Sequence, residues 1–213
     1  MNNTKLDPVE ERTVQAFDAE AELQFKKDPP GRAGDDLRFA FTLAPTNPLV
    51  LDVGCGYGRV VPHLRQIGAF RYVGIDPSIE MLKIGAREHP ELDLRPMNLY
   101  ELPQNFPESR FNIAIAITTL AYVTTTRMGE ALTSIRKVLV HGGIGYFTFM
   151  NVNETIRLAQ NWPVDANYPG PAATLTGWKF ERIQHLLKRS GFKPEQVYGY
   201  GDSPLYSIVV KAI

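Results

Sequence analysis

Three glycines directly after an apolar run are the residues whose spacing most clearly indicates chemistry. Leu49-Val50-Leu51-Asp52-Val53 is expected to form a buried parallel strand, because four of its five residues are aliphatic. Gly54, Gly56 and Gly58 follow on alternate positions, where a backbone without Cβ atoms can turn tightly and approach a ligand. Apolar residues then recur at helical spacing over 60–67. Strand, glycine loop and helix together are typical of a nucleotide-type site.

The glycine spacing separates two classes of cofactor. A dinucleotide loop of the form G-x-G-x-x-G would need a third glycine at position 59, which is Arg59. The stretch from Asp52 to Gly58 instead resembles the first motif of the class I, Rossmann-like methyltransferases that use S-adenosylmethionine (SAM). The resemblance implies SAM as cofactor, S-adenosylhomocysteine (SAH) as product, and a cofactor site that includes Asp52, Gly54, Cys55, Gly56, Tyr57 and Gly58.

An acidic residue, Asp76, ends the second expected strand, 71–75. Its two oxygens could accept both hydroxyls of a ribose. Alternatively it caps the following helix, a role that Ser78 could take equally well. Because dinucleotide enzymes also have an acid here, Asp76 indicates an adenosine site without selecting the cofactor. The resemblance places Pro77, Ser78 and Met81 beside the ribose and adenine.

Asn98 occupies a position where the family often has Asp, which accepts a hydrogen bond from the adenine amino group. An amide oxygen can do the same without charge, and the next backbone N–H, of Leu99, is expected to meet the ring. Some quinone-biosynthesis methyltransferases are similar in having Asn there. Otherwise Asn98 is a turn residue. Ile117, at the end of the expected central strand 111–117, completes the implied cofactor site.

The candidates for the acceptor side of the site are Phe17, Tyr122, Asn151 and Tyr168, and no residue is indicated as a catalytic base. Many family members have His where Tyr122 stands. The alternative for Tyr122 is an aromatic side chain packed on the next helix. Residues 151–176, rich in proline and aromatic residues, are expected to form a loop on the substrate side, although such aromatics can simply anchor a loop.

The spacing of apolar residues predicts a single α/β domain over residues 1–213. The family resemblance implies a Rossmann-like, mostly parallel seven-stranded sheet with helices on both faces and a C-terminal antiparallel hairpin. Helices are expected over 9–26, 35–43 and from 128 to a stop at Gly142-Gly143, with strands over 144–149, 192–200 and 205–211. Residues 1–48 are expected to form a helical lid, unless the first helix only packs on the sheet edge.

The composition of the chain limits the kinds of binding partner that we expect. Lys and Arg total 23 and Asp and Glu total 23, so no overall charge attracts nucleic acid. No apolar run suits a membrane helix or a signal peptide, so we expect no membrane insertion and a cytoplasmic protein. One cysteine excludes an internal disulfide, and the four histidines are scattered, which indicates no metal site.

Absent motifs favour a small-molecule methyl acceptor, whether oxygen, nitrogen or carbon. Ile117-Thr118-Thr119-Leu120 replaces the Asn/Asp-Pro-Pro-Tyr/Phe of enzymes that methylate amino groups of nucleic acids. A non-catalytic SAM-fold protein that regulates or binds a partner is the main alternative, and an NAD-dependent oxidoreductase is disfavoured by Arg59. A monomer and a homodimer are both compatible with the sequence.

Overall fold

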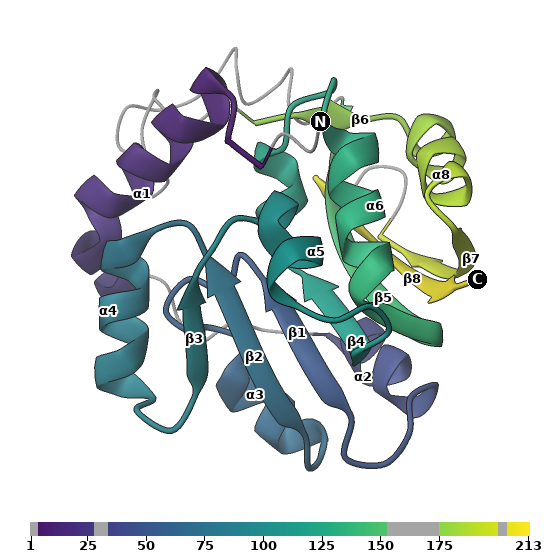
Figure 1. Ribbon diagram of the computed structural model, residues 1–213, viewed down its shortest axis with the longest axis horizontal. Helices are drawn as coiled ribbons and strands as arrows, with labels where there is room; N and C mark the ends of the chain where they lie inside the picture. Colours follow the sequence, from purple (N-terminus) through teal and green to yellow (C-terminus); the bar gives the residue numbers. More distant parts are fainter. Residues whose placement is uncertain (1–3, 28–33, 153–174, 200–203) are drawn as a thin grey trace.

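One twisted sheet runs through the molecule, as the computed structural model shows (Figure 1). The structure describes residues 4–27, 34–152, 175–199 and 204–213. Along the main path the strand order is β3-β2-β1-β4-β5-β8-β7. Neighbours from β3 to β5 are parallel, whereas β8 is antiparallel to both β5 and β7. This order confirms the predicted Rossmann-like α/β fold with its C-terminal hairpin.

The elements have the following bounds. The strands are β1 Leu49–Val53, β2 Arg71–Asp76, β3 Asp93–Pro96, β4 Phe111–Ala116, β5 Leu139–Asn151, β6 Gly177–Trp178, β7 Phe192–Tyr198 and β8 Leu205–Ala212. The α-helices are α1 Pro8–Lys27, α2 Asp35–Thr42, α3 Val61–Ile67, α4 Ile79–Glu88, α5 Leu102–Asn105, α6 Met128–Val138 and α8 Phe180–Arg189. Two 3-10 helices are η1 Leu99–Glu101 and η2 Thr119–Tyr122. The two-residue β6 pairs with the end of β5, off the main path.

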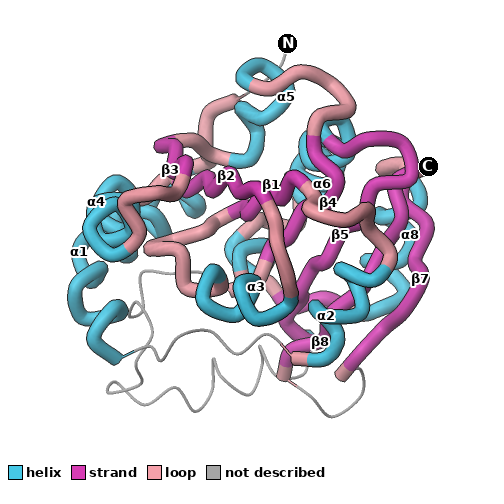
Figure 2. Tube along the Cα trace, turned by 90° about the horizontal axis from the view of Figure 1, so that it is seen from below, coloured by secondary structure: helices cyan, strands magenta, loops and turns pink. Residues whose placement is uncertain are grey.

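Alternate strand residues supply two cores, one on each face of the sheet. In β1, Leu51 and Val53 belong to the core that includes α5, α6 and α8, whereas Val50 belongs to the core that includes α2, α3 and α4. Figure 2 shows the sheet edge-on, with α5 and α6 on one side and α2 and α3 on the other. Because helices cover both faces, the carboxyl ends of the strands are the natural place for a site.

The boundary between α6 and β5 differs from the prediction. The helix was expected to run to Gly142-Gly143, but it ends at Val138, and those glycines lie within β5. Pairing across the sheet decides the boundary, because Leu139 already pairs with Phe111 of β4. A register shift on β4 between Phe111 and Ile113 then absorbs the extra residues of β5. Tertiary pairing here overrides a pattern that is compatible with a longer helix.

The N-terminal helix α1 lies against α4 at one end of the sheet (Figure 1). It begins with a capping box, in which Asp7 accepts the N–H groups of Val9 and Glu10 while Glu10 accepts the N–H of Asp7. Pro8 takes the first helical position, where its missing N–H costs least. The predicted break at residues 29–31 and most of the predicted loop 151–176, including Tyr168, lie outside the described residues.

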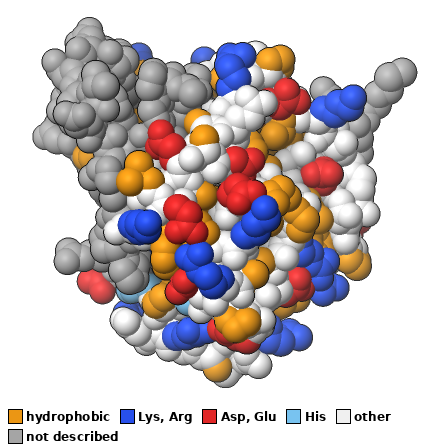
Figure 3. Space-filling view, turned by 90° about the vertical axis from the view of Figure 1, so that its left-hand side faces the viewer, with side chains coloured by type: hydrophobic (Ala, Val, Ile, Leu, Met, Phe, Trp, Pro, Cys, Tyr) orange, Lys and Arg blue, Asp and Glu red, His pale blue; other side chains and the backbone are white. Residues whose placement is uncertain are grey.

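Acidic and basic side chains are interspersed on the face that α1 and α4 form (Figure 3). Exposed ion pairs there include Arg87 with Glu22 and Lys83 with Glu80. Among the described residues of this face there is therefore no patch of a single sign that would attract a polyanion (Figure 3). None of the described helices combines the length and the apolar character that crossing a membrane requires.

Candidate functional site

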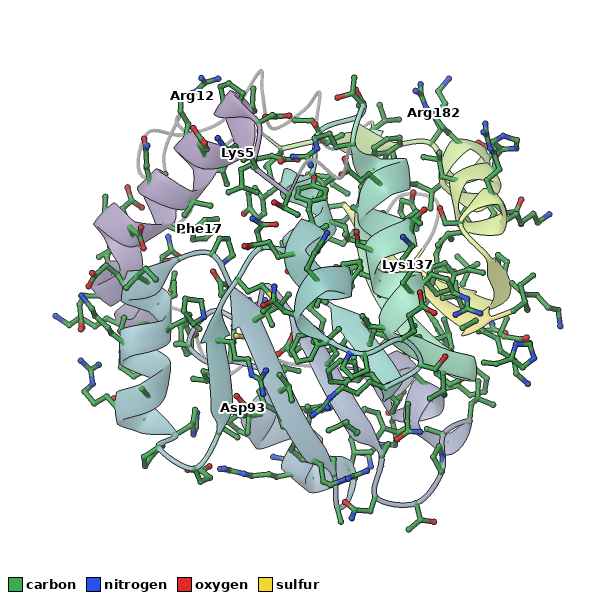
Figure 4. The ribbon with its side chains drawn as sticks, viewed as in Figure 1. Lys5, Arg12, Phe17, Asp93, Lys137 and Arg182 are labelled. Carbon is green, nitrogen blue, oxygen red and sulfur yellow. The ribbon has the colours of Figure 1, made fainter. Side chains whose placement is uncertain are left out.

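A cavity of about 420 Å³ lies at the carboxyl ends of β1, β2 and β4. The glycine loop after β1 and the segments that follow β2, β3 and β4 line it. Helix α1 closes one side with Thr13, Val14 and Phe17. In Figure 4, Phe17 lies on the side of α1 that faces the strands. The cavity is therefore bounded both by the sheet domain and by the N-terminal helix.

The glycine loop has the backbone geometry that its sequence predicts. Gly54, Gly56 and Gly58 have φ values of 71°, 55° and 82°, in the left-handed region that favours glycine. A Cβ on Gly54 would lie 2.2 Å from Oγ1 of Thr119, the first residue of η2. This hydroxyl donates to the carbonyl of Val53 at 2.7 Å. Nothing lies within 4 Å of a Cβ placed on Gly56, so this backbone is open to a ligand. The loop thus fits a cofactor that lies directly on its main chain.

Asp76 joins this loop to the next segment. One carboxylate oxygen accepts the N–H of Gly56 at 2.8 Å, and the other accepts the N–H of Ser78 at 2.8 Å. Removal from solvent raises the pKa of Asp76 to about 6, although these two hydrogen bonds act to lower it. Each oxygen can accept a second hydrogen bond, so ribose hydroxyls remain possible donors. The side chain that caps α4 is Ser78, whose Oγ accepts the N–H of Met81 at 3.2 Å.

Asn98 lines the cavity and also begins η1. Its Oδ1 accepts the N–H of Tyr100 at 2.9 Å, and its Nδ2 donates to the carbonyl of Thr4 at 3.0 Å. The structure therefore realises the turn role that was the alternative for this residue. The amide oxygen can accept a second hydrogen bond, and the contact with adenine stays a prediction.

The expected acceptor side contains two aromatic rings from distant parts of the chain. Phe17 on α1 and Tyr122 on η2 pack edge to face, with ring centroids 5.2 Å apart and an interplanar angle of 88°. Leu6, Val14 and Val123 line the same cavity. This part of the cavity is thus walled by apolar and aromatic groups rather than by free charges.

The structure brings together most of the predicted site residues. Those that line the cavity are Phe17, Gly54, Cys55, Gly56, Tyr57, Asp76, Pro77, Ser78, Met81, Asn98, Leu99, Ile117 and Tyr122. Three described candidates, Asp52, Gly58 and Asn151, are not among the lining residues. Their predicted contacts with cofactor or acceptor therefore have no counterpart in the cavity wall.

Asp52 lies beneath the glycine loop instead. Its carboxylate is buried and accepts a hydrogen bond from the hydroxyl of Tyr72 on β2 at 2.6 Å. Burial raises the pKa of Asp52 to about 7, although the hydrogen bond from Tyr72 and the charge of Arg59 act to lower it. In this structure Asp52 therefore ties β1 to β2 under the loop.

A buried polar network at the cavity edge was not predicted from the sequence. Glu10 accepts hydrogen bonds from the hydroxyl of Tyr100 at 2.7 Å and from Arg127 at 3.2 Å. The guanidinium of Arg127 lies 3.5 Å from the centroid of the Tyr100 ring and donates to the carbonyl of Lys5 at 2.6 Å. The Glu10 and Arg127 side chains are only 6% and 10% exposed, so this ion pair is buried. It fixes the start of α1 to the sheet domain.

A second cavity, of about 440 Å³, is lined by residues of η1, α5, α6 and α8 and of the segment before α6, and many of them are polar. Within the described ranges no three His, Cys, Asp or Glu residues are grouped so that they could hold a metal ion. The cavity at the strand ends provides the better candidate for a cofactor site, because the glycine loop and Asp76 line it and not the second cavity.

Comparisons with known proteins found one matching domain family and several similar folds. Residues 50–143 match the model of a family described as a methyltransferase domain. A chain from the complex that contains the Haloferax volcanii Trm112 methyltransferase activator is 16% identical, with a TM-score of 0.73 over 94% of this chain and 97% of that one. A SAM-dependent methyltransferase from Methanosarcina mazei is 16% identical, with a TM-score of 0.67 over 82% and 97%.

Another solved structure with this fold is the [4+2]-cyclase SpnF, which is 17% identical, with a TM-score of 0.69 over 93% of this chain and 94% of that one. No match was found among curated proteins. At these identities the solved structures establish the fold, whereas the family model covers the glycine loop and Asp76 themselves. Residues 50–143 therefore resemble a methyltransferase domain, the solved structures share the fold of this chain, and SAM is the cofactor that these similarities imply.

Proposed function

We propose that this protein transfers a methyl group from SAM to a small-molecule acceptor. The observation that carries the proposal is the junction of Gly56 and Asp76, where open glycine backbone lies beside a carboxylate at the edge of a cavity. Such a junction can hold a nucleoside by its ribose while the loop lies along the rest of the cofactor. The family match over residues 50–143 supports the same assignment.

When bound, SAM supplies a methyl group already activated by a positively charged sulfur. The chain would therefore contribute mainly alignment and exclusion of water. Asp76 would hold the ribose, and Met81 and Leu99 would contact the base. Phe17 and Tyr122 would shield the acceptor side, and neither is an obvious base for an acceptor that must lose a proton first.

A small acceptor is supported by how the cavity is covered. Helix α1 lies across one side and is held there by the buried pair of Glu10 and Arg127. A duplex or a folded protein would need an open approach to the strand ends. The mixed charges on the face of α1 and α4 also give a polyanion little attraction (Figure 3). Membership of the quinone-biosynthesis group, a cytoplasmic location and a monomeric or dimeric state remain predictions.

Titration calorimetry with SAH, SAM and NAD tests the cofactor. We expect SAH to bind in the micromolar range and NAD to bind at least about tenfold more weakly, since Arg59 stands where a dinucleotide loop needs glycine. Asp76→Ala should weaken SAH binding by about 1–3 kcal/mol through loss of hydrogen bonds to a charged acceptor. Equal affinity for SAH and NAD would refute the assignment.

The reaction itself needs a separate experiment because one fold supports several chemistries, as the cyclase with this fold illustrates. Incubation with SAM and a metabolite extract, followed by mass spectrometry, should reveal a small molecule that gains one methyl group while SAH appears. Binding of SAM without formation of SAH from any acceptor would favour a non-catalytic or cyclase-like role instead.

A further inference from the structure

Helix α1 reaches the cofactor side of the cavity through one carboxylate. Oδ1 of Asp18 accepts the hydroxyl hydrogen of Ser78 at 2.6 Å and the N–H of Glu80 at 3.1 Å. Both partners belong to the start of α4, where the first N–H groups of a helix have no acceptor within the helix. Asp18 thus helps to cap α4, although it lies on a different helix and 60 residues before Ser78.

The same contacts continue into the cofactor loop. Ser78, which is 1% exposed, donates its N–H to Asp76, and Asp76 accepts the N–H of Gly56. A continuous line of hydrogen bonds therefore runs from Asp18 through Ser78 and Asp76 to Gly56. It connects α1 with Asp76, the carboxylate that we propose to bind the ribose.

Several ionisable groups surround Asp76 and affect its pKa. Asp18 faces it from α1, Asp52 lies on β1, Cys55 lies in the loop and Tyr72 lies on β2. The negative charge of Asp18 raises the pKa of Asp76, in addition to the larger effect of burial. A second carboxylate so close to the site is compensated by the donors and the positive end of the α4 dipole.

We propose that Asp18 is a positioning residue, which orients the turn from Asp76 to Ser78 for the ribose of the cofactor when α1 is docked. The inference rests on the proposed cofactor site and deepens it, since it makes docking of α1 and cofactor affinity interdependent. Asp18 does not need to touch the cofactor, because it acts through Ser78.

Titration of the folded protein with SAH tests this role. Asp18→Ala should weaken SAH binding about tenfold, because two hydrogen bonds to a charged acceptor are lost from the start of α4. Asp18→Asn keeps an oxygen acceptor and should stay within about threefold of the wild type. Glu11→Ala, at an exposed acid of the same helix, is the matched control and should leave affinity unchanged. Thermal unfolding verifies that each variant is folded.

Two further readouts separate positioning from a general effect on the fold. In an Asp76→Ala background, Asp18→Ala should cause little additional loss of SAH affinity, because the group it orients is gone. The pH below which SAH binding weakens should be lower in Asp18→Asn than in the wild type, since one negative charge beside Asp76 is removed. Such a shift reports that Asp18 stands beside Asp76 in solution, as docking of α1 requires.

Three results would overturn the inference while the proposed function stands: unaltered SAH affinity in Asp18→Ala, fully additive losses in the double variant, or an unshifted pH profile in Asp18→Asn. Absence of SAH binding to the wild-type protein would instead overturn the proposed function, and this inference with it. The two failures are therefore distinguishable from the wild-type titration alone.

Discussion

Replacing Arg127 with methionine should destabilise the protein strongly. The change removes the partner of a buried carboxylate while keeping a long apolar side chain over the Tyr100 ring. Glu10 would then remain in a largely dry environment without a countercharge. Loss of one member of a buried ion pair typically costs about 3–5 kcal/mol.

The surroundings place this variant near the lower end of that range. Glu10 would keep three other donors, namely the hydroxyl of Tyr100 at 2.7 Å and the N–H groups of Asp7 and Thr124, each at 3.3 Å. The carbonyl of Lys5 would also lose the hydrogen bond that Arg127 donates to it in the wild type. We therefore expect the free energy of unfolding to fall by about 3 kcal/mol.

Urea unfolding measures this difference, with Arg87→Met as the matched control. Arg87 also links the sheet domain to α1, through Glu22, but both side chains are more than half exposed. Such a pair contributes about 0–1 kcal/mol. Adding Glu10→Gln to Arg127→Met should restore part of the lost stability, because no unpaired charge stays buried.

A fall of less than about 1 kcal/mol in the free energy of unfolding of Arg127→Met would refute the reasoning, since Glu10 would then be solvated or held by other groups.

A large fall would also show how firmly the expected N-terminal lid is attached. The pairing of Glu10, the Asp18 hydrogen bonds and the apolar cluster of Ala21 with Met81 attach α1 along its length. Removing α1 should therefore lower stability, and any opening must break these contacts.

The glycines of the loop should respond differently to alanine. Gly54→Ala should cost at least about 3 kcal/mol of stability, because an unfavourable φ adds to a clash with Thr119. Gly56→Ala should cost about 1–2 kcal/mol but strongly impair SAH binding. Urea unfolding measures the stability of both variants and calorimetry their SAH binding, and equal losses of stability would contradict this prediction. Asp52 and Asp76, with pKa values raised to about 7 and about 6, bind more protons in the folded than in the unfolded protein between about pH 4 and pH 7. Their contribution to stability should therefore decrease as pH rises through that window, while SAH affinity increases. In thermal unfolding, stability should fall less over this window in Asp52→Asn than in the wild type, and a steeper fall in the variant would argue against this assignment.

Much of the lining of the cavity at the strand ends could be predicted because its signals are local. Glycines on alternate positions, an acid at the end of the next strand and a serine at a helix start each have a short-range physical cause. The structure places Gly54, Gly56, Asp76 and Ser78 around one cavity, as expected. Asp52 differs because strand alternation places it on the same face as Val50, where the hydroxyl of Tyr72 donates to its carboxylate.

The contacts of α1 could not be predicted because their partners are remote in the sequence. Glu10 and Arg127 are 117 residues apart, and each resembles an ordinary surface charge in its local context. The capping pattern Asp7-Pro8-Val9-Glu10 is visible in the sequence, but it indicates only where the helix begins. That Glu10 also accepts from Arg127 depends on how the helix docks.

The position of β8 has a consequence for how the chain is made. The strand Leu205–Ala212 follows β7 in the sequence, yet it lies between β5 and β7 and pairs with β5 from Ile144 to Met150. While the protein is synthesised, this edge of β5 lacks its antiparallel partner until β8 emerges. Unpaired edges of this kind are where nascent chains associate with one another. We therefore expect chains interrupted before residue 205 to aggregate more readily than the complete hairpin.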